Sequence, residues 1–123
     1  MTEYFGHEKL DVYKVSLEYV ALVYRWAETL NGHHRHARDQ LLQASQSIPL
    51  NIAEGNGKGI QADRRRFFEI ARGSALECAA IQDVLTAGDK LTAQQNTTGK
   101  QLLHHIVSML TRLGRSYERK NNA

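Results

Sequence analysis

The chain has 123 residues, with 16 Lys and Arg against 13 Asp and Glu, so its formal net charge is +3 at pH 7. Hydrophobic residues make up 41% and charged residues 24%, which is typical of one soluble globular domain and excludes a largely disordered or fibrous chain. Proline occurs once, and no apolar run approaches the roughly 18 residues of a membrane span. An all-α, cytoplasmic protein with no membrane contact is therefore expected.

Apolar residues recur at spacings of three and four, which predicts four helices over about residues 9–30, 36–55, 63–87 and 93–118. Short glycine-rich or polar turns separate them, so residues 1–123 are expected to form a single antiparallel up-down-up-down four-helix bundle. Pro49 falls inside the second helix, where a proline removes one backbone hydrogen bond and costs roughly 3 kcal/mol. We therefore predict that the second helix is kinked at Pro49 and packed against its neighbours.

Each predicted helix has one stripe of residues expected to face the core. The four stripes are Val12, Val15, Tyr19, Val23, Trp26 and Leu30; Leu41, Ala44 or Ser45, Ile48 and Ile52; Phe67, Ile70, Ala71, Ser74, Cys78, Ile81 and Leu85; and Leu103, Ile106, Leu110, Leu113 and Tyr117. The lone cysteine, Cys78, cannot form an internal disulfide and is expected to be a small buried residue, with a reactive thiol as the alternative. Thr92 and Gln95 fit a capping box at the start of the fourth helix.

The first helix has a second apolar stripe, roughly 110° from the first around the helix axis. A second stripe indicates a second contact, because a large exposed apolar patch usually marks an interface. The alternative is an enlarged core within one copy. We assign this second stripe to an oligomer interface, with the residues Tyr13, Leu17, Val20 and Tyr24.

Glu77 falls on the predicted core stripe of the third helix, so its carboxylate is expected to point into the bundle, which is costly unless it is paired. Polar side chains at matching spacing on the second helix are predicted to face it. The expected structural polar network is Ser47, Asn51, Glu54, Ser74 and Glu77. A functional carboxylate pair that holds a proton or a metal is the alternative.

A run of three arginines, Arg64, Arg65 and Arg66, opens the third helix, where the helix dipole disfavours cations by a few tenths of a kcal/mol each. With Lys58 and Arg72 they form a candidate basic patch for nucleic-acid phosphates or an acidic protein surface. A merely solvated face remains the alternative. The end of the chain is also basic, with five cations against one acid: Lys100, Arg112, Arg115, Arg119 and Lys120 against Glu118.

No catalytic or metal-binding motif emerges. No Glu has a His three residues later, as di-iron bundles require, and no nucleophile motif is present. The turn Asn56-Gly57-Lys58-Gly59 lacks the Gly-Lys-Ser/Thr of a phosphate-binding loop, and the histidines 33, 34 and 36 are expected to be a solvated turn. We expect no enzyme activity, no catalytic residue, no cofactor and no metal.

Several short motifs together resemble one known family. The strongest is Ser47-Ile48-Pro49 followed by Asn51-Ile52-Ala53-Glu54-Gly55; the others are Gln40-Leu41, Phe67-Phe68, Ala71-Arg72-Gly73-Ser74-Ala75-Leu76-Glu77 and Met109-Leu110. From Leu10 to about Tyr117 the chain resembles the four-helix bundle proteins encoded in intervening sequences of bacterial 23S rRNA genes. That group is similar to the accessory subunit of diversity-generating retroelements, which binds nucleic acid and a reverse transcriptase.

The resemblance implies a homo-oligomer, with a pentameric ring as the expected form. Five copies would concentrate the surplus positive charge and favour polyanion binding. We therefore expect a non-enzymatic, ring-forming bundle that binds structured nucleic acid, RNA or DNA, or a nucleic-acid-processing partner. The alternative is a protein-interaction scaffold with no nucleic-acid role.

Overall fold

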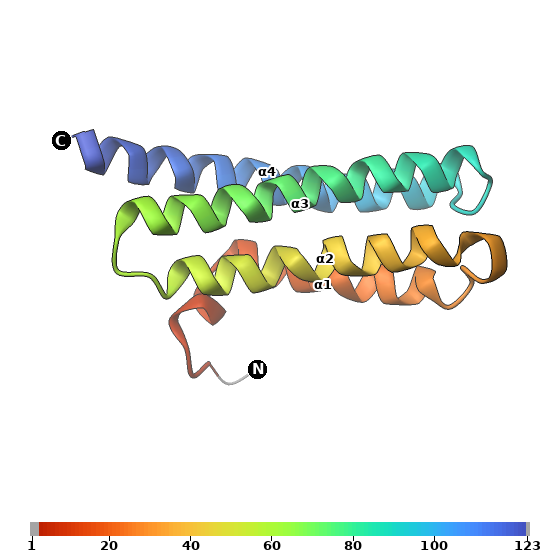
Figure 1. Cartoon of the computed structure of the whole chain (residues 1–123), viewed down its shortest axis with the longest axis horizontal. Coiled ribbons are helices and arrows are strands. Elements are labelled where there is room, and N and C mark those ends of the chain that lie inside the picture. The colour runs from red at the N-terminus through yellow and green to blue at the C-terminus, as the bar shows by residue number, and fades with distance from the viewer. Residues whose placement is uncertain (1–2, 123) are drawn as a thin grey trace.

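The computed structural model describes residues 3–122, with side chains described for residues 3–117. Four helices, α1 (Asp11–Ala27), α2 (Arg35–Asn56), α3 (Gln61–Ala87) and α4 (Ala93–Asn122), form the bundle, and the 3-10 helices η1 (Gly6–Lys9) and η2 (Gly32–His34) precede α1 and α2 (Figure 1). The described residues contain no strand, so the predicted all-α four-helix bundle is confirmed.

The helices surround one core, because each long helix lies alongside two others: α1 alongside α2 and α4, and α3 alongside α2 and α4. The turn between α2 and α3 lies at one end of the bundle, and the turns from α1 to α2 and from α3 to α4 lie at the other (Figure 1). Pro49 is buried inside α2, which continues from Arg35 to Asn56. The kink there stays a prediction.

The first helix is shorter at both ends than the hydrophobic pattern predicts. Lys9 belongs to η1, and α1 ends at Ala27, where the amide and the hydroxyl of Thr29 both donate to the carbonyl oxygen of Trp26. Gly32 has a φ of 61°, which glycine adopts without strain. The chain thus leaves the helix before Leu30, although Leu30 remains buried in the core.

The predicted core stripes of α1, α2 and α4 are confirmed. Both Ala44 and Ser45 are buried beside Leu41, Ile48 and Ile52. Three residues of these stripes, at the edges of the core, are only partly buried: Val15, Leu113 and Tyr117.

The predicted core stripe of α3 is confirmed at Ala71, Cys78 and Leu85 and is wrong at its other positions. Its buried residues are Phe68, Ala71, Ala75, Cys78, Gln82 and Leu85. Ile70 is instead 43% exposed, and Phe67, Ser74 and Ile81 lie half-buried at the flank of the helix. The inward face of α3 includes small residues, Ala71, Ala75 and Cys78, which do not stand out from the sequence as a core stripe, whereas the large apolar Ile70 is exposed.

A buried hydrogen-bond network joins α1, α3 and α4 through the side chain of Gln82. The Tyr19 hydroxyl donates to Gln82 Oε1 at 2.6 Å, and Gln82 Nε2 donates to the Asn96 backbone oxygen at 3.1 Å and to Asn96 Oδ1 at 2.9 Å. Buried polar groups are costly when unpaired, and every polar atom of the Gln82 side chain here has a partner. The predicted capping box, in which Thr92 and Gln95 exchange hydrogen bonds at 2.8 and 3.0 Å, starts α4 and is confirmed.

Cys78 is buried in the core, as expected, and its burial raises the pKa of its thiol to about 12. In an unfolded chain this pKa is about 8.5. Because the folded chain holds the thiol proton more tightly, raising the pH above about 8.5 favours the unfolded chain. We expect the stability advantage of the native chain over Cys78→Ala, measured by urea unfolding, to shrink from about pH 7 to about pH 10. An advantage that grows over this range would contradict a buried neutral thiol.

Candidate nucleic-acid interface

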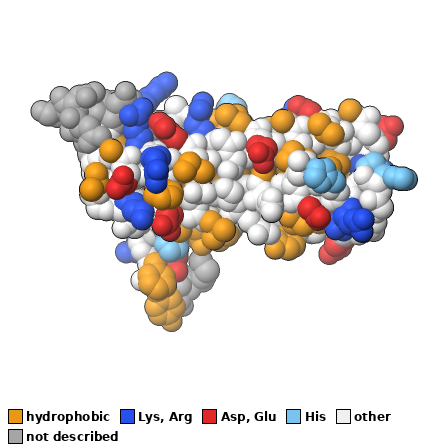
Figure 2. Space-filling view, in the orientation of Figure 1, with side chains coloured by type: hydrophobic (Ala, Val, Ile, Leu, Met, Phe, Trp, Pro, Cys, Tyr) orange, Lys and Arg blue, Asp and Glu red, His pale blue; other side chains and the backbone are white. Residues whose placement is uncertain are grey.

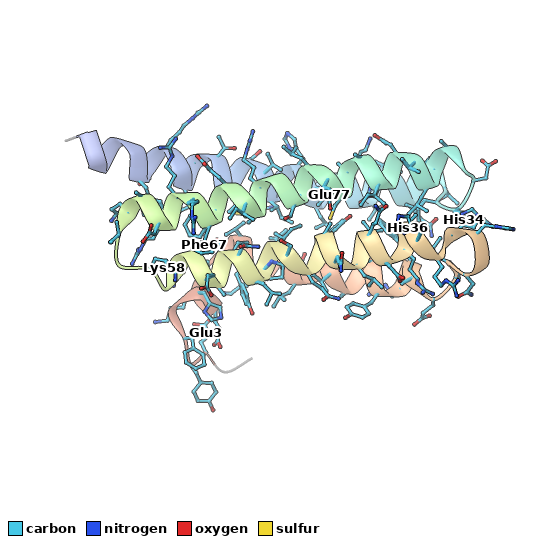
Figure 3. All side chains as sticks on the ribbon, in the orientation of Figure 1. Glu3, His34, His36, Lys58, Phe67 and Glu77 are labelled. Atoms are coloured by element: carbon cyan, nitrogen blue, oxygen red, sulfur yellow. The ribbon has the colours of Figure 1, made fainter. Side chains whose placement is uncertain are left out.

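The turn between α2 and α3 brings two of the predicted basic residues onto one aromatic ring. Lys58 Nζ lies 5.3 Å from the centre of the Phe67 ring, and the Arg66 guanidinium carbon lies 5.2 Å from it. Figure 3 shows Lys58 and Phe67 near each other at this end of the bundle. Lys58 Nζ also lies 3.4 Å from Glu54 Oε1. Cation–π contacts hold these two cations in place at the rim of the bundle.

Arg64 links the same turn to α4. Its Nε donates to the backbone oxygen of Lys58, and its guanidinium carbon lies 5.9 Å from the centre of the Tyr117 ring. Tyr117 stacks on Phe68 with ring centres 5.7 Å apart. The side chain of Arg64 therefore fastens the turn to the end of the bundle. It is half-buried and not fully exposed to solvent.

The other two predicted cations, Arg65 and Arg72, lie on the opposite flank of α3, where they line a groove between α3 and α4. The groove has a volume of about 350 Å³ and is lined by Arg65, Phe68, Glu69, Arg72, Leu110, Thr111, Gly114 and Arg115. We call it the arginine groove. Among its described lining residues it carries three guanidinium groups and one carboxylate, so these residues give it a net positive charge.

Hydrogen bonds orient the side chains of the arginine groove. Arg72 Nε donates to Thr111 Oγ1 at 3.0 Å, and that hydroxyl donates in turn to the Val107 carbonyl oxygen at 2.8 Å. Arg65 Nε lies 3.2 Å from Glu69 Oε1, one turn along α3. Among the described residues, no atom lies within 4 Å of a Cβ added at Gly114, so they leave the groove open at that position. Lys and Arg side chains lie at this end of the surface in Figure 2, with acidic ones among them.

Arg115 and Thr111 are groove residues that were not assigned to the candidate site from the sequence. Arg115 belongs to the basic end of the chain, and this cluster of cations is the sequence feature that could have indicated a role in the site. What placed it here is the antiparallel pairing of α3 with α4, in which Arg72 meets Thr111 and Asp83 meets Lys100. The side chains of Arg119 and Lys120, two further cations of this segment, lie outside the described residues.

Part of the predicted polar network comes together between α2 and α3. The Ser47 and Ser74 hydroxyl oxygens lie 2.8 Å apart, and Asn51 Nδ2 donates to Ser47 Oγ at 2.9 Å. The inward orientation predicted for Glu77 is wrong: its side chain is exposed, midway along α3 (Figure 3). The rotation of α3 that buries Ala75 and Cys78 turns Glu77 to solvent. Glu54 is also exposed and lies beside Lys58 instead of the serines.

The second stripe of α1 is graded from half-buried to exposed. Tyr13 and Val20 are half-buried, while Leu17 is 37% and Tyr24 is 53% exposed. The Tyr24 hydroxyl accepts a hydrogen bond from Gln46 Nε2 on α2 at 3.0 Å. The assignment of this stripe to an oligomer interface stays a prediction.

The described residues form neither a metal cluster nor a membrane-spanning helix. Among the side chains that the structure describes, those of residues 3–117, no three His, Cys, Asp or Glu are grouped so that they could hold a metal ion. His34 and His36 lie at the end of the bundle opposite Lys58 (Figure 3). Within the same part of the chain, no helix combines the length and apolar character needed to cross a membrane.

Comparisons with known proteins identify the family of the chain. A structure described as a protein with unknown function from the S23 ribosomal protein family of Bacteroides thetaiotaomicron VPI-5482 superposes with a TM-score of 0.78, covering 84% of this chain and 97% of that chain. The two are 22% identical, so this likeness shows the fold alone. No curated protein sequence matches. The model for the 23S rRNA-intervening sequence protein matches residues 8–112, from η1 to most of α4. The chain therefore belongs to the family of 23S rRNA-intervening sequence proteins.

Proposed function

We propose that this chain binds structured nucleic acid, with the phosphate backbone lying against the arginine groove. The observation that carries the proposal is the convergence of Arg65 and Arg72 of α3 with Arg115 of α4 on one open groove. The guanidinium fork matches two phosphate oxygens at once, which makes arginine well suited to phosphate recognition. The family to which the chain belongs is compatible with this role, and the relation to retroelement accessory subunits stays a prediction.

The arrangement of the arginines supports phosphate binding over a solvated face. Arg72 is held by the Thr111 hydroxyl, so part of the entropy cost of ordering its side chain is met before a ligand arrives. The Arg65 Nε lies 3.2 Å from the Glu69 carboxylate, and exposed pairs of this kind contribute only about 0 to 1 kcal/mol. A phosphate can therefore compete with Glu69 for the guanidinium of Arg65. Lys58 and Arg66 extend the positive surface around the end of the bundle.

The proposal predicts a steep dependence of binding on salt. A fluorescently labelled RNA hairpin should bind the chain at low ionic strength, and the logarithm of the affinity should fall linearly with the logarithm of salt concentration, with a slope of roughly −0.7 to −0.9 for each phosphate contacted. We expect a slope of about −3 or steeper, measured by fluorescence anisotropy. A hairpin that does not bind at low salt, or an affinity that ignores salt, would contradict the proposal.

We also propose that copies of the chain associate through the second stripe of α1, with a homopentamer as the expected form. The exposed parts of Leu17 and Tyr24 support this proposal, because association would bury apolar surface that now faces solvent. Sedimentation at micromolar concentration should give a homo-oligomer for the native chain and a smaller species for the variant Leu17→Glu with Tyr24→Glu. Leu50→Glu, which changes a leucine that is 68% exposed on α2, is the matched control and should leave the oligomer unchanged. A monomeric native chain at that concentration would overturn the proposal.

A further inference from the structure

A second, apolar cavity continues the seam between α3 and α4 beyond the arginine groove. It has a volume of about 240 Å³, and its lining consists of Ala75, Leu76, Ala79, Lys100, Leu103, His104 and Val107. We call it the apolar pocket. The contacts Arg72 to Thr111 and Asp83 to Lys100 fix the antiparallel register of this seam, so the apolar pocket lies between those two contacts and directly follows the arginine groove.

The apolar pocket has an apolar floor and a polar rim. Ala75 and Leu103 are buried at the floor, and the small side chain of Ala79 leaves room above them. Leu76 forms an apolar wall and is 50% exposed. The rim is formed by two polar side chains. The imidazole of His104 is exposed, and the ammonium of Lys100 pairs with Asp83. An imidazole is one of the side chains on which unstacked bases pack in RNA complexes.

The spacing between groove and pocket suits one nucleotide. Leu76 is four residues after Arg72, which is about 6 Å of helix rise. A phosphate held by the guanidinium of Arg72 thus lies close enough for the base of an adjoining nucleotide to enter the apolar pocket. A duplex cannot supply that base, because its bases are stacked and paired, whereas a bulge or loop can.

From this continuity we infer that the chain recognises nucleic acid at an unpaired nucleotide, whose base occupies the apolar pocket while its backbone lies in the arginine groove. This inference rests on the proposed function and adds to it the class of ligand. The pocket is smaller than the roughly 300 to 1,000 Å³ of typical sites for drug-sized ligands, which fits a single ring system. Charge complementarity supports a nucleic acid as the occupant, because the positively charged arginine groove, which Arg72 lines, adjoins the pocket, while Lys100 at the far rim is paired with Asp83.

The test compares three RNA hairpins of the same stem: fully paired, with a bulge of unpaired nucleotides, and with the same bulge made abasic. The native chain should bind the bulged hairpin about tenfold more tightly than the paired one, since stacking of one base on a protein surface contributes on this order. The abasic bulge should lose most of that preference.

Two variants locate the effect. Ala79→Leu fills the apolar pocket and Leu76→Ser removes its wall, and both should bring the bulged hairpin to within about twofold of the paired one. Val84→Ser, which changes another exposed apolar residue of α3 outside the pocket, is the control and should keep the full preference. Circular dichroism confirms that each variant is folded, and Leu76→Ser, at a half-exposed position, serves if Ala79→Leu does not fold.

The possible results separate the inference from the function on which it rests. If none of the three hairpins binds at low salt, the proposed function fails, and the inference fails with it. If all three hairpins bind the native chain equally, the inference about the unpaired nucleotide is overturned, whereas phosphate binding in the arginine groove is not. If the pocket variants leave the preference unchanged but alter sedimentation of the free protein, the pocket is a contact between copies, and the inference is again overturned.

Discussion

Replacing Gly99 with alanine should destabilise the folded chain by about 3 kcal/mol and lower its thermal midpoint by roughly 10 °C. Gly99 lies on the buried side of α4, against the hydrogen-bond network centred on Gln82. A Cβ at this position would overlap Gln82 Oε1 and would lie 2.7 Å from both Gln82 Nε2 and the Cη2 atom of Trp26. These separations are too short for carbon atoms, so either the helix or its neighbours must move.

Neither neighbour of Gly99 can move cheaply. The Gln82 side chain is held by Tyr19 and Asn96, and displacing it would leave buried polar groups unpaired, at about 1 to 3 kcal/mol. Trp26 is buried in the core. Overpacking a close-packed core adds a further penalty of about 1 to 3 kcal/mol.

Gly73→Ala is the matched control for Gly99→Ala. Gly73 also lies inside a helix, but no atom lies within 4 Å of a Cβ added there. The alanine should therefore stabilise the chain by about 0.5 to 1 kcal/mol, since glycine is a poor helix former. Urea and thermal unfolding of both variants measure the difference. A Gly99→Ala variant as stable as the native chain would contradict the described packing of α4 against α1 and α3.

Changing Arg65, Arg72 and Arg115 together to glutamine should weaken binding of an RNA hairpin by roughly a hundredfold at low salt. Each hydrogen bond to a charged group contributes about 1.5 to 3 kcal/mol, and the arginines' contacts within the protein, which phosphate must replace, reduce the total. The slope of affinity against salt should also become shallower by about 2, as fewer counterions are released. Fold stability should change little, since two of these side chains, Arg72 and Arg115, are exposed and Arg65 is half-exposed. Fluorescence anisotropy over a series of salt concentrations measures both quantities.

A second triple variant separates the position of the charges from their number. Arg25, Arg35 and Lys90 are exposed and lie near the turns at the opposite end of the bundle (Figure 1). Changing them to glutamine removes the same total charge, so a purely non-specific attraction would respond equally to both triples. We expect the control to lose less than about threefold in affinity, because screening weakens effects beyond roughly 10 Å. Equal losses in the two variants would rule out the arginine groove as the binding site.

The sequence predicted the elements of the fold more accurately than the faces that they bury. Leu41, Ile48 and Ile52 recur at helical spacing and are all buried, because large aliphatic residues mark an inward face clearly. On α3 that signal is weaker: Phe68 and Leu85 are buried, but so are alanines and Gln82, while Ile70 is exposed. A buried glutamine is understood only with its partners Tyr19 and Asn96, and their meeting depends on the packing of three helices.

The candidate site could be predicted in composition but not in arrangement. The run from Arg64 to Arg66 marks a basic segment, yet successive helical residues point about 100° apart. The three side chains therefore separate, with Arg64 toward Tyr117, Arg65 toward the groove and Arg66 toward Phe67. The contribution of Arg115 follows from the register between α3 and α4, which a single sequence does not reveal.

The most direct test of the central claim is a map of the backbone amides that respond when nucleic acid binds. Nuclear magnetic resonance of the isotopically labelled chain, titrated with an RNA hairpin that carries a bulge, reports each amide separately. We predict that the largest shifts fall on residues 64–72 of α3 and residues 107–115 of α4, which border the arginine groove. Shifts concentrated at the opposite end of the bundle, near the turns that join α1 to α2 and α3 to α4, would contradict this account.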